Sequence, residues 1–93
     1  MKDTIDLGDD HVIVLTDYKG EKRVGGNVAH LTKDGCVCNQ FIPFEGRAWA
    51  NGFQGRITTW KVENDLPLTL SPSLLCRACG DHGFIRNGKW ERA

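Results

Sequence analysis

The sequence has no surplus of either charge and no long apolar run. Its 93 residues include 12 basic and 12 acidic side chains, which cancel to a formal net charge of +0. A neutral chain has no long-range field that would draw it to nucleic acid or to an anionic membrane. No apolar run approaches the ~20 residues that cross a bilayer, and residues 1–10 lack the basic and apolar regions of a signal peptide. We therefore expect a cytoplasmic protein with no membrane partner.

The signatures of common metal-dependent and redox enzymes are also missing. The sequence contains no His-Glu-x-x-His motif and no His-x-Glu paired with Pro-Cys-x-x-Cys, so zincin and deaminase chemistry are not indicated. Its one Cys-x-x-Cys leads into Gly80-Asp81-His82-Gly83, which is a poor helix opening and argues against a thioredoxin-like site. We therefore predict no catalytic residues and no enzymatic activity, with a metal-dependent hydrolase as the least favoured alternative.

Long helices are absent from the pattern, and short strands replace them. Eleven glycines interrupt every apolar run. Residues 11–18 are rich in β-branched side chains, and residues 56–64 alternate with Trp60 and Val62 on one face, so both segments are predicted strands. Asn87-Gly88 favours a type I′ turn and therefore a closing β-hairpin. We predict a small β-rich single domain, mainly β or α+β, over residues 11–93, preceded by a flexible acidic tail over residues 1–10.

Three further segments give weaker local predictions. Gly25-Gly26 suits a bulge or a sharp bend. Asn51-Gly52 suits a hairpin turn. Residues 66–76 fit either a strand or a short helix that begins at Ser71-Pro72 and ends at Gly80.

Four cysteines form two pairs, Cys36-x-Cys38 and Cys76-x-x-Cys79. Closely spaced cysteines in a turn can deliver two thiolates to one tetrahedral ion, and disulfides are rare in reducing compartments. A chain this short also buries only a small core, so a metal staple would stabilise it. We therefore predict one structural Zn²⁺ per chain bound by all four cysteines, in a fold like a zinc ribbon or zinc knuckle.

His82 is a fifth candidate ligand, because it lies three residues after Cys79. If His82 coordinates the ion, one cysteine, Cys38 or Cys76, is a bystander. If it does not, its imidazole lies outside the ligand shell or on the surface. The other two histidines, His11 and His30, have no spacing to a partner and are expected to be structural.

Several motifs together carry a resemblance to a known family. They are the first cysteine pair, the strand tryptophan Trp60, the run Ser71-Pro72-Ser73-Leu74-Leu75 and the closing His82-Gly83-Phe84-Ile85-Arg86-Asn87-Gly88. Over residues 31–90 the chain resembles a family of small phage-encoded and prophage-encoded proteins, some of which occur in bacterial ubiquitin-like operons. The first pair is tighter here than in that family, and Asp81 replaces a cysteine before the histidine, for which we expect Cys76 and Cys79 to compensate. The resemblance implies a zinc-binding, phage-type protein.

Two functions are consistent with these features. The first is an interaction protein that binds a host or phage macromolecule, with a protein as the favoured partner. The alternative is a single-stranded nucleic-acid-binding module, in which aromatic side chains stack on bases and arginines contact phosphates. The residues that would form this surface are Arg47, Trp49, Phe53 and Arg56. The competing interpretation places the two aromatic residues in the core, which a small domain needs for stability.

Overall fold

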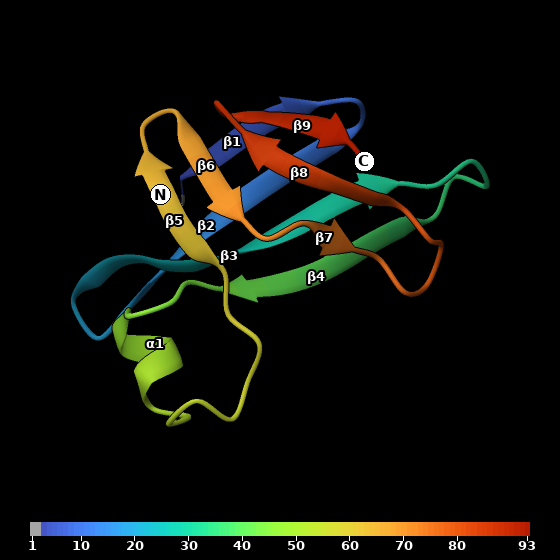
Figure 1. Ribbon diagram of the computed structural model, residues 1–93. Helices are drawn as coiled ribbons and strands as arrows, with labels where there is room; N and C mark the ends of the chain where they lie inside the picture. The colour runs from blue at the N-terminus through green and yellow to red at the C-terminus, as the bar shows by residue number, and fades with distance from the viewer. Residues whose placement is uncertain (1–2) are drawn as a thin grey trace.

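Four antiparallel strands form the largest of the three sheets. The computed structural model describes residues 3–93 (Figure 1). The strands β1 (Thr4–Gly8), β2 (His11–Tyr18), β3 (Glu21–Leu31) and β4 (Val37–Pro43) are hydrogen-bonded in the order β1-β2-β3-β4. The bounds of β2 agree with the strand expected over residues 11–18, where β-branched side chains alternate between buried and half-buried positions.

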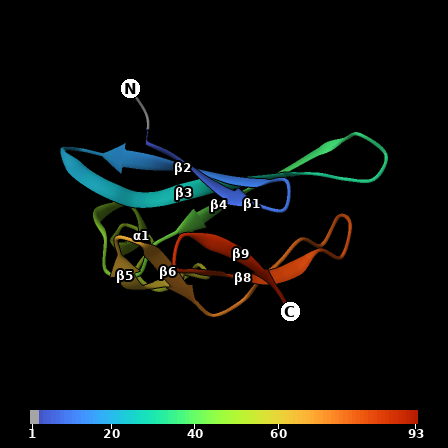
Figure 2. The same ribbon diagram turned by 90° about the horizontal axis from the view of Figure 1, so that it is seen from above.

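The remaining strands form a second layer against one face of this sheet (Figure 2). β5 (Lys61–Asp65) pairs with β6 (Leu68–Ser71), and β7 (Leu74–Leu75), β8 (His82–Arg86) and β9 (Lys89–Arg92) form a sheet in that order. Asn87 and Gly88, with φ angles of 52° and 71°, join β8 to β9. Two consecutive positive φ angles are what a type I′ turn requires, so the closing hairpin is confirmed.

The apolar core fills the space between the two layers. Phe44 is the largest fully buried side chain, and Trp60 and Trp90 are each 8% exposed. The smaller core residues come from both layers: Leu7, Ile13, Leu15, Val28, Ile42, Leu68, Leu70, Leu74 and Ile85. A single core shared by all sheets confirms the predicted β-rich single domain.

The described part of the predicted tail, residues 3–10, contains a strand. Thr4–Gly8 is strand β1, paired with β2, and Leu7 is only 2% exposed. The acidic residues of this segment alternate with Ile5 and Leu7, so charged side chains face solvent while apolar side chains face the core. The prediction was wrong because the number of aspartates obscured this alternation. Met1 and Lys2 lie outside the described residues.

Gly25 and Gly26 are both paired with β2 and β4, and the irregularity of the β2–β3 ladder lies just before them, between the Thr16–Gly25 and Tyr18–Glu21 pairs. Both glycines serve close packing. A Cβ atom on Gly26 would lie 2.7 Å from Cγ1 of Ile13, and one on Gly25 would lie 2.7 Å from the carbonyl oxygen of Ile42. The pair therefore lets the core and the neighbouring strand approach the β3 backbone.

Other local predictions also need correction. The strand expected over residues 56–64 begins only at Lys61, and Trp60 makes an isolated bridge to Phe44. The hairpin turn expected at Asn51-Gly52 is instead the end of a one-turn helix, α1 (Ala48–Asn51). Residues 66–76 form strands β6 and β7, so the helix alternative is wrong. No helix within residues 3–93 is long and apolar enough to cross a membrane.

Two phenylalanines provide a test of this core. Phe44→Ala should lower the free energy of unfolding by about 3–5 kcal/mol, because it leaves a cavity at a side chain with 0% exposure. Phe53→Ala, at a side chain that is 39% exposed, should cost less than about 1.5 kcal/mol. Urea denaturation monitored by tryptophan fluorescence measures both values. Equal losses for the two variants would contradict the assignment of the core.

Candidate functional site

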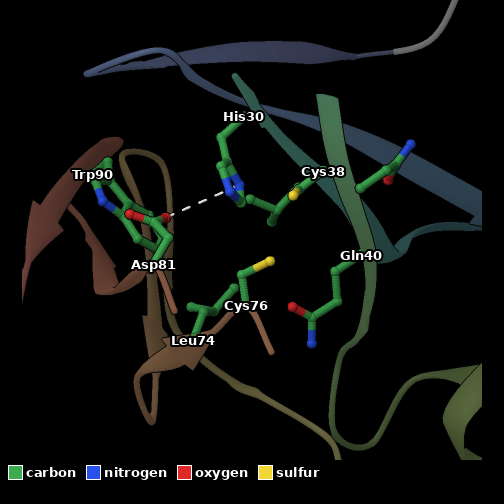
Figure 3. Close-up of a pocket in the computed structure, with 9 residues that line it drawn as sticks. His30, Cys38, Gln40, Leu74, Cys76, Asp81 and Trp90 are labelled. Atoms are coloured by element: carbon green, nitrogen blue, oxygen red, sulfur yellow. Dashed lines mark ion pairs between the residues drawn. The ribbon is translucent and has the colours of Figure 1, made fainter. Parts of the chain in front are cut away.

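Four potential metal ligands converge between the two layers. They are His30 on β3, Cys38 on β4, and Cys76 and Cys79 in the turn between β7 and β8. Their ligand atoms all lie within 4.8 Å of one another, and Nε2 of His30 is 3.2 Å from Sγ of Cys79. Figure 3 shows the side chains of His30, Cys38 and Cys76 pointing toward the same space. We call these four residues the donor cluster.

Strand pairing explains why His30 belongs to the donor cluster. His30 lies directly opposite Cys38 in the β3–β4 ladder, where paired side chains are about 4.5–5.5 Å apart at Cβ. This position makes His30 a candidate ligand, although the sequence indicated no partner for it. The register follows from a hairpin centred on residue 34. Asp34 and Gly35 are residue types that favour turns, so the sequence contains a local signal for this hairpin.

Cys36 lies outside the donor cluster, contrary to the predicted ligand set. It is exposed in the turn before β4, where its carbonyl oxygen accepts a hydrogen bond from the Thr32 N–H. Two residues along an extended chain advance by about 6.6 Å, so Cys36 and Cys38 do not deliver their sulfurs to one point. The Cys-x-Cys spacing suits a turn, whereas Cys38 lies on a strand.

A tight turn brings Cys76 and Cys79 together. The Gly80 N–H donates to the Cys76 carbonyl, and the Cys76 N–H donates to the Asp81 carbonyl, each at 2.7 Å. Gly80 adopts a φ of 80°, in the left-handed region that favours glycine. The turn therefore holds both sulfurs of the Cys-x-x-Cys pair on the side that faces His30 and Cys38.

Without a bound cation, the surroundings of Cys38, Cys76 and Cys79 disfavour the ionisation of all three thiols together. Desolvation and the neighbouring sulfurs of Cys76 and Cys79 raise the pKa of Cys38 to about 11. Desolvation also opposes ionisation of Cys76, but hydrogen bonds from the backbone of Cys79 and Ala78 outweigh it and lower the pKa of that thiol. A bound cation would stabilise all of the thiolates at once.

Asp81 and His11 lie beside His30 of the donor cluster. An Asp81 carboxylate oxygen lies 2.6 Å from Nε2 of His11 and 4.0 Å from Nδ1 of His30. His11 stacks between His30 and Trp90, with ring centroids 4.8 Å and 4.1 Å away. The carbonyl of Asp9 accepts the proton of His11 Nδ1 at 2.6 Å. A carboxylate beside the distal nitrogen of a ligand histidine orients the ring and raises its basicity.

His82 lies outside the donor cluster and pairs with Ser73 instead. Its Nε2 is 2.8 Å from Oγ of Ser73. The β7–β8 ladder aligns Leu74 with Gly83 and Leu75 with His82, and buried Leu74 faces the core. Because side chains alternate along a strand, Ser73 and His82 emerge as diagonal neighbours on the outer side, whereas Asp81 faces the donor cluster.

The strands that carry this pair are held by close packing. The indole N–H of Trp60 donates to the carbonyl of Ser73 at 3.3 Å. A Cβ atom on Gly83 would lie 2.6 Å from the Trp90 ring, so only glycine lets Trp90 pack beneath β8. A surface groove of about 690 Å³ borders His82 and provides room for a ligand.

The sequence contains only two serines, Ser71 and Ser73, and three histidines. The Ser71 hydroxyl donates to the Glu63 carboxylate at 3.2 Å. Of the other histidines, His11 contacts Asp81 and His30 belongs to the donor cluster. The contact between Ser73 and His82 is therefore the one serine–histidine hydrogen bond among residues 3–93.

A family model matches residues 2–93, nearly the whole chain. Its description is "Bacterial ubiquitination-like system serine protease (BubE)". The chain belongs to the BubE family. The match confirms the expected link with bacterial ubiquitin-like operons, while the phage origin stays a prediction. No curated protein and no solved structure matched the chain.

Membership in the BubE family corrects our expectation that the protein is not an enzyme. The family is described as a serine protease, and the absence of metal-dependent and thiol enzyme motifs does not bear on serine chemistry. Ser73 and His82 are nine residues apart and match no local catalytic motif, so we predicted no catalytic residues. The turn between β7 and β8 brings them together, and only the strand register reveals it.

The residues proposed for nucleic-acid binding have partners within this BubE chain. Arg47 donates to the Arg23 carbonyl at 3.1 Å and lies 3.6 Å from the Asp65 carboxylate. The half-buried Trp49 ring packs against Phe53, with ring centroids 4.6 Å apart. Arg56, like Phe53, is exposed. Nucleic-acid binding at this surface stays a prediction.

Matched cysteine variants test the donor cluster. The purified BubE chain should contain about one metal ion, because the four donors are enough for one tetrahedral site. Cys36→Ser should retain the ion, whereas Cys79→Ser should lose it. Elemental analysis of the purified variants measures both contents. Loss of the ion from Cys36→Ser alone would show that the donor cluster is assigned incorrectly.

Matched histidine variants test the same assignment. His30→Ala should lower metal affinity by at least about 10-fold, whereas His82→Ala should leave it unchanged, since its imidazole contacts Ser73. Competition with a chromophoric chelator measures these affinities. A loss of metal affinity in His82→Ala but not in His30→Ala would show that His82 is a ligand.

Proposed function

We propose that this protein is a serine protease that cleaves an amide bond in a protein of a bacterial ubiquitination-like system. Ser73 is its nucleophile and His82 its general base. The observation that carries the proposal is the 2.8 Å contact between Ser73 Oγ and His82 Nε2 on the outer side of β7 and β8. The description of the BubE family supports the reaction class and the biological system.

The chemistry follows from this contact. His82 Nε2 accepts the hydroxyl proton as Ser73 Oγ attacks the substrate carbonyl carbon, and His82 then gives that proton to the leaving amine. Water hydrolyses the resulting acyl-enzyme, with His82 again accepting a proton. Within residues 3–93, no carboxylate hydrogen-bonds to His82, so the pair acts as a dyad in the substrate-free protein.

We assign Zn²⁺ as the ion of the donor cluster and give it a structural role. Three thiolates and one imidazole are a common closed donor set for tetrahedral zinc. All four positions are filled by protein atoms, so this arrangement leaves none for substrate or for a reacting water. When bound, the ion supplies charge compensation and a cross-link between His30, Cys38, Cys76 and Cys79.

The protein partner expected from the sequence becomes a substrate in this proposal. Of the reacting pair, only His82 lines the groove. Leu75, which is 47% exposed, lies opposite His82 in the ladder and on the same outer side as Ser73. An extended polypeptide would find both an apolar contact and the reacting pair on this side of the molecule.

The two serines allow a matched test of the nucleophile. A fluorophosphonate probe, which reacts with activated serines, should label the wild type and Ser71→Ala but not Ser73→Ala. His82→Ala should lower the labelling rate by about 10³-fold or more, because the hydroxyl loses its base. Mass spectrometry of the labelled peptide identifies the modified residue. Labelling of Ser73→Ala at the wild-type rate would eliminate this mechanism.

A further inference from the structure

We propose that the donor cluster, when loaded with metal, is the positioning device for the Ser73–His82 pair, which is formed only while the ion is bound. This inference rests on the proposed function for its catalytic consequence. The geometric coupling itself depends only on the positions of the residues. The ion acts through the β7–β8 turn and does not contact the substrate.

The ladder that aligns the pair is too short to hold it alone. β7 has two residues, and its register with β8 consists of Leu74 opposite Gly83 and Leu75 opposite His82. Other contacts hold each strand separately: the Trp60 N–H donates to the Ser73 carbonyl, and β8 pairs with β9 from Gly83 to Arg86. Neither of these contacts joins β7 to β8. The alignment of Ser73 with His82 therefore needs another constraint.

The donor cluster supplies that constraint at the turn. Cys76 directly follows β7, and Cys79 lies three residues before His82, so two of the four donors belong to the segment that joins the catalytic strands. The other two, His30 and Cys38, are paired on the larger sheet. A bound ion would fasten the β7–β8 turn to that sheet, whereas its removal would leave three crowded thiols at the same place.

Asp81 links the position of the donor cluster to that of His82. It directly precedes His82 and contacts His11 at 2.6 Å, and it lies 4.0 Å from the ligand His30. Because neighbouring side chains of a strand face opposite sides, Asp81 and His82 are fixed by the same rotation of the β8 backbone. A small rotation would move His82 Nε2 out of hydrogen-bond range of Ser73. We therefore identify Asp81 as a positioning residue.

Nitrogen NMR of the histidine rings tests the coupling without any reaction. In the metal-loaded protein, the His82 ring nitrogens should differ between wild type and Ser73→Ala, which gives the signature of the hydrogen bond. Chelation of the wild type should change His82 to the Ser73→Ala signature. Persistence of the wild-type signature in the metal-free protein would overturn the inference, even if Ser73 proved not to be the nucleophile.

Because the metal-free protein can unfold entirely, a second variant keeps the test decisive. Asp81→Asn should retain the metal and the fold, shift the His82 signature and lower the rate of fluorophosphonate labelling by about 10-fold or more. Glu45→Gln, at an exposed residue outside the groove, is the matched control and should match the wild type. A metal-loaded, folded Asp81→Asn protein with an unchanged His82 signature would overturn the positioning role.

Metal exchange separates positioning from catalysis. Proteins loaded with Zn²⁺, Co²⁺ or Cd²⁺ should label at rates within about threefold of one another, since the ion only holds the turn. The Co²⁺ absorption bands should not change when the probe reacts. A difference above 10-fold at equal metal content, or a spectral change on labelling, would show that the ion contacts the reacting groups and would overturn the inference. Loss of labelling in Ser73→Ala, with the ion still bound, independently supports the proposed function.

Discussion

The convergence of His30 and Cys38 with Cys76 and Cys79 is the constraint on which the site depends. Two donors come from a regular hairpin of the larger sheet, and two come from a turn between strands of two and five residues. The apolar core joins the layers without specifying the path of this turn. Directional bonds to a common cation would specify that path, because tetrahedral coordination restricts both distance and angle.

The two sides of the β7–β8 hairpin carry different kinds of residue. Leu74 enters the core and Asp81 faces the donor cluster, while Ser73 and His82 meet on the outer side. The pleat of the strands produces this division, because successive side chains point in opposite directions. The proposed hydrolase site and the candidate metal site are therefore adjacent in the sequence but lie on opposite sides of the strands.

Much of the local structure could be predicted from local signals. The alternation in residues 11–18 and the Asn87-Gly88 turn identified β2 and the closing hairpin. Three of the four members of the donor cluster were among the predicted ligands, because Cys76 and Cys79 have the spacing of a metal-binding turn and Cys38 belongs to a cysteine pair. His30 and Ser73 were not among the predicted site residues, since the contact that makes each a candidate is with a partner across a strand ladder rather than with a neighbour in the chain.

The sequence by itself determined which side chains were available: four cysteines, three histidines and two serines in a short, neutral, strand-forming chain. Composition and local spacing are sufficient for that, because turn geometry and strand alternation act over a few residues. Only the tertiary structure decided that His30 replaces Cys36 in the donor cluster and that His82 pairs with Ser73. Those choices depend on strand register, which sets cross-strand distances and is established only when the whole chain packs.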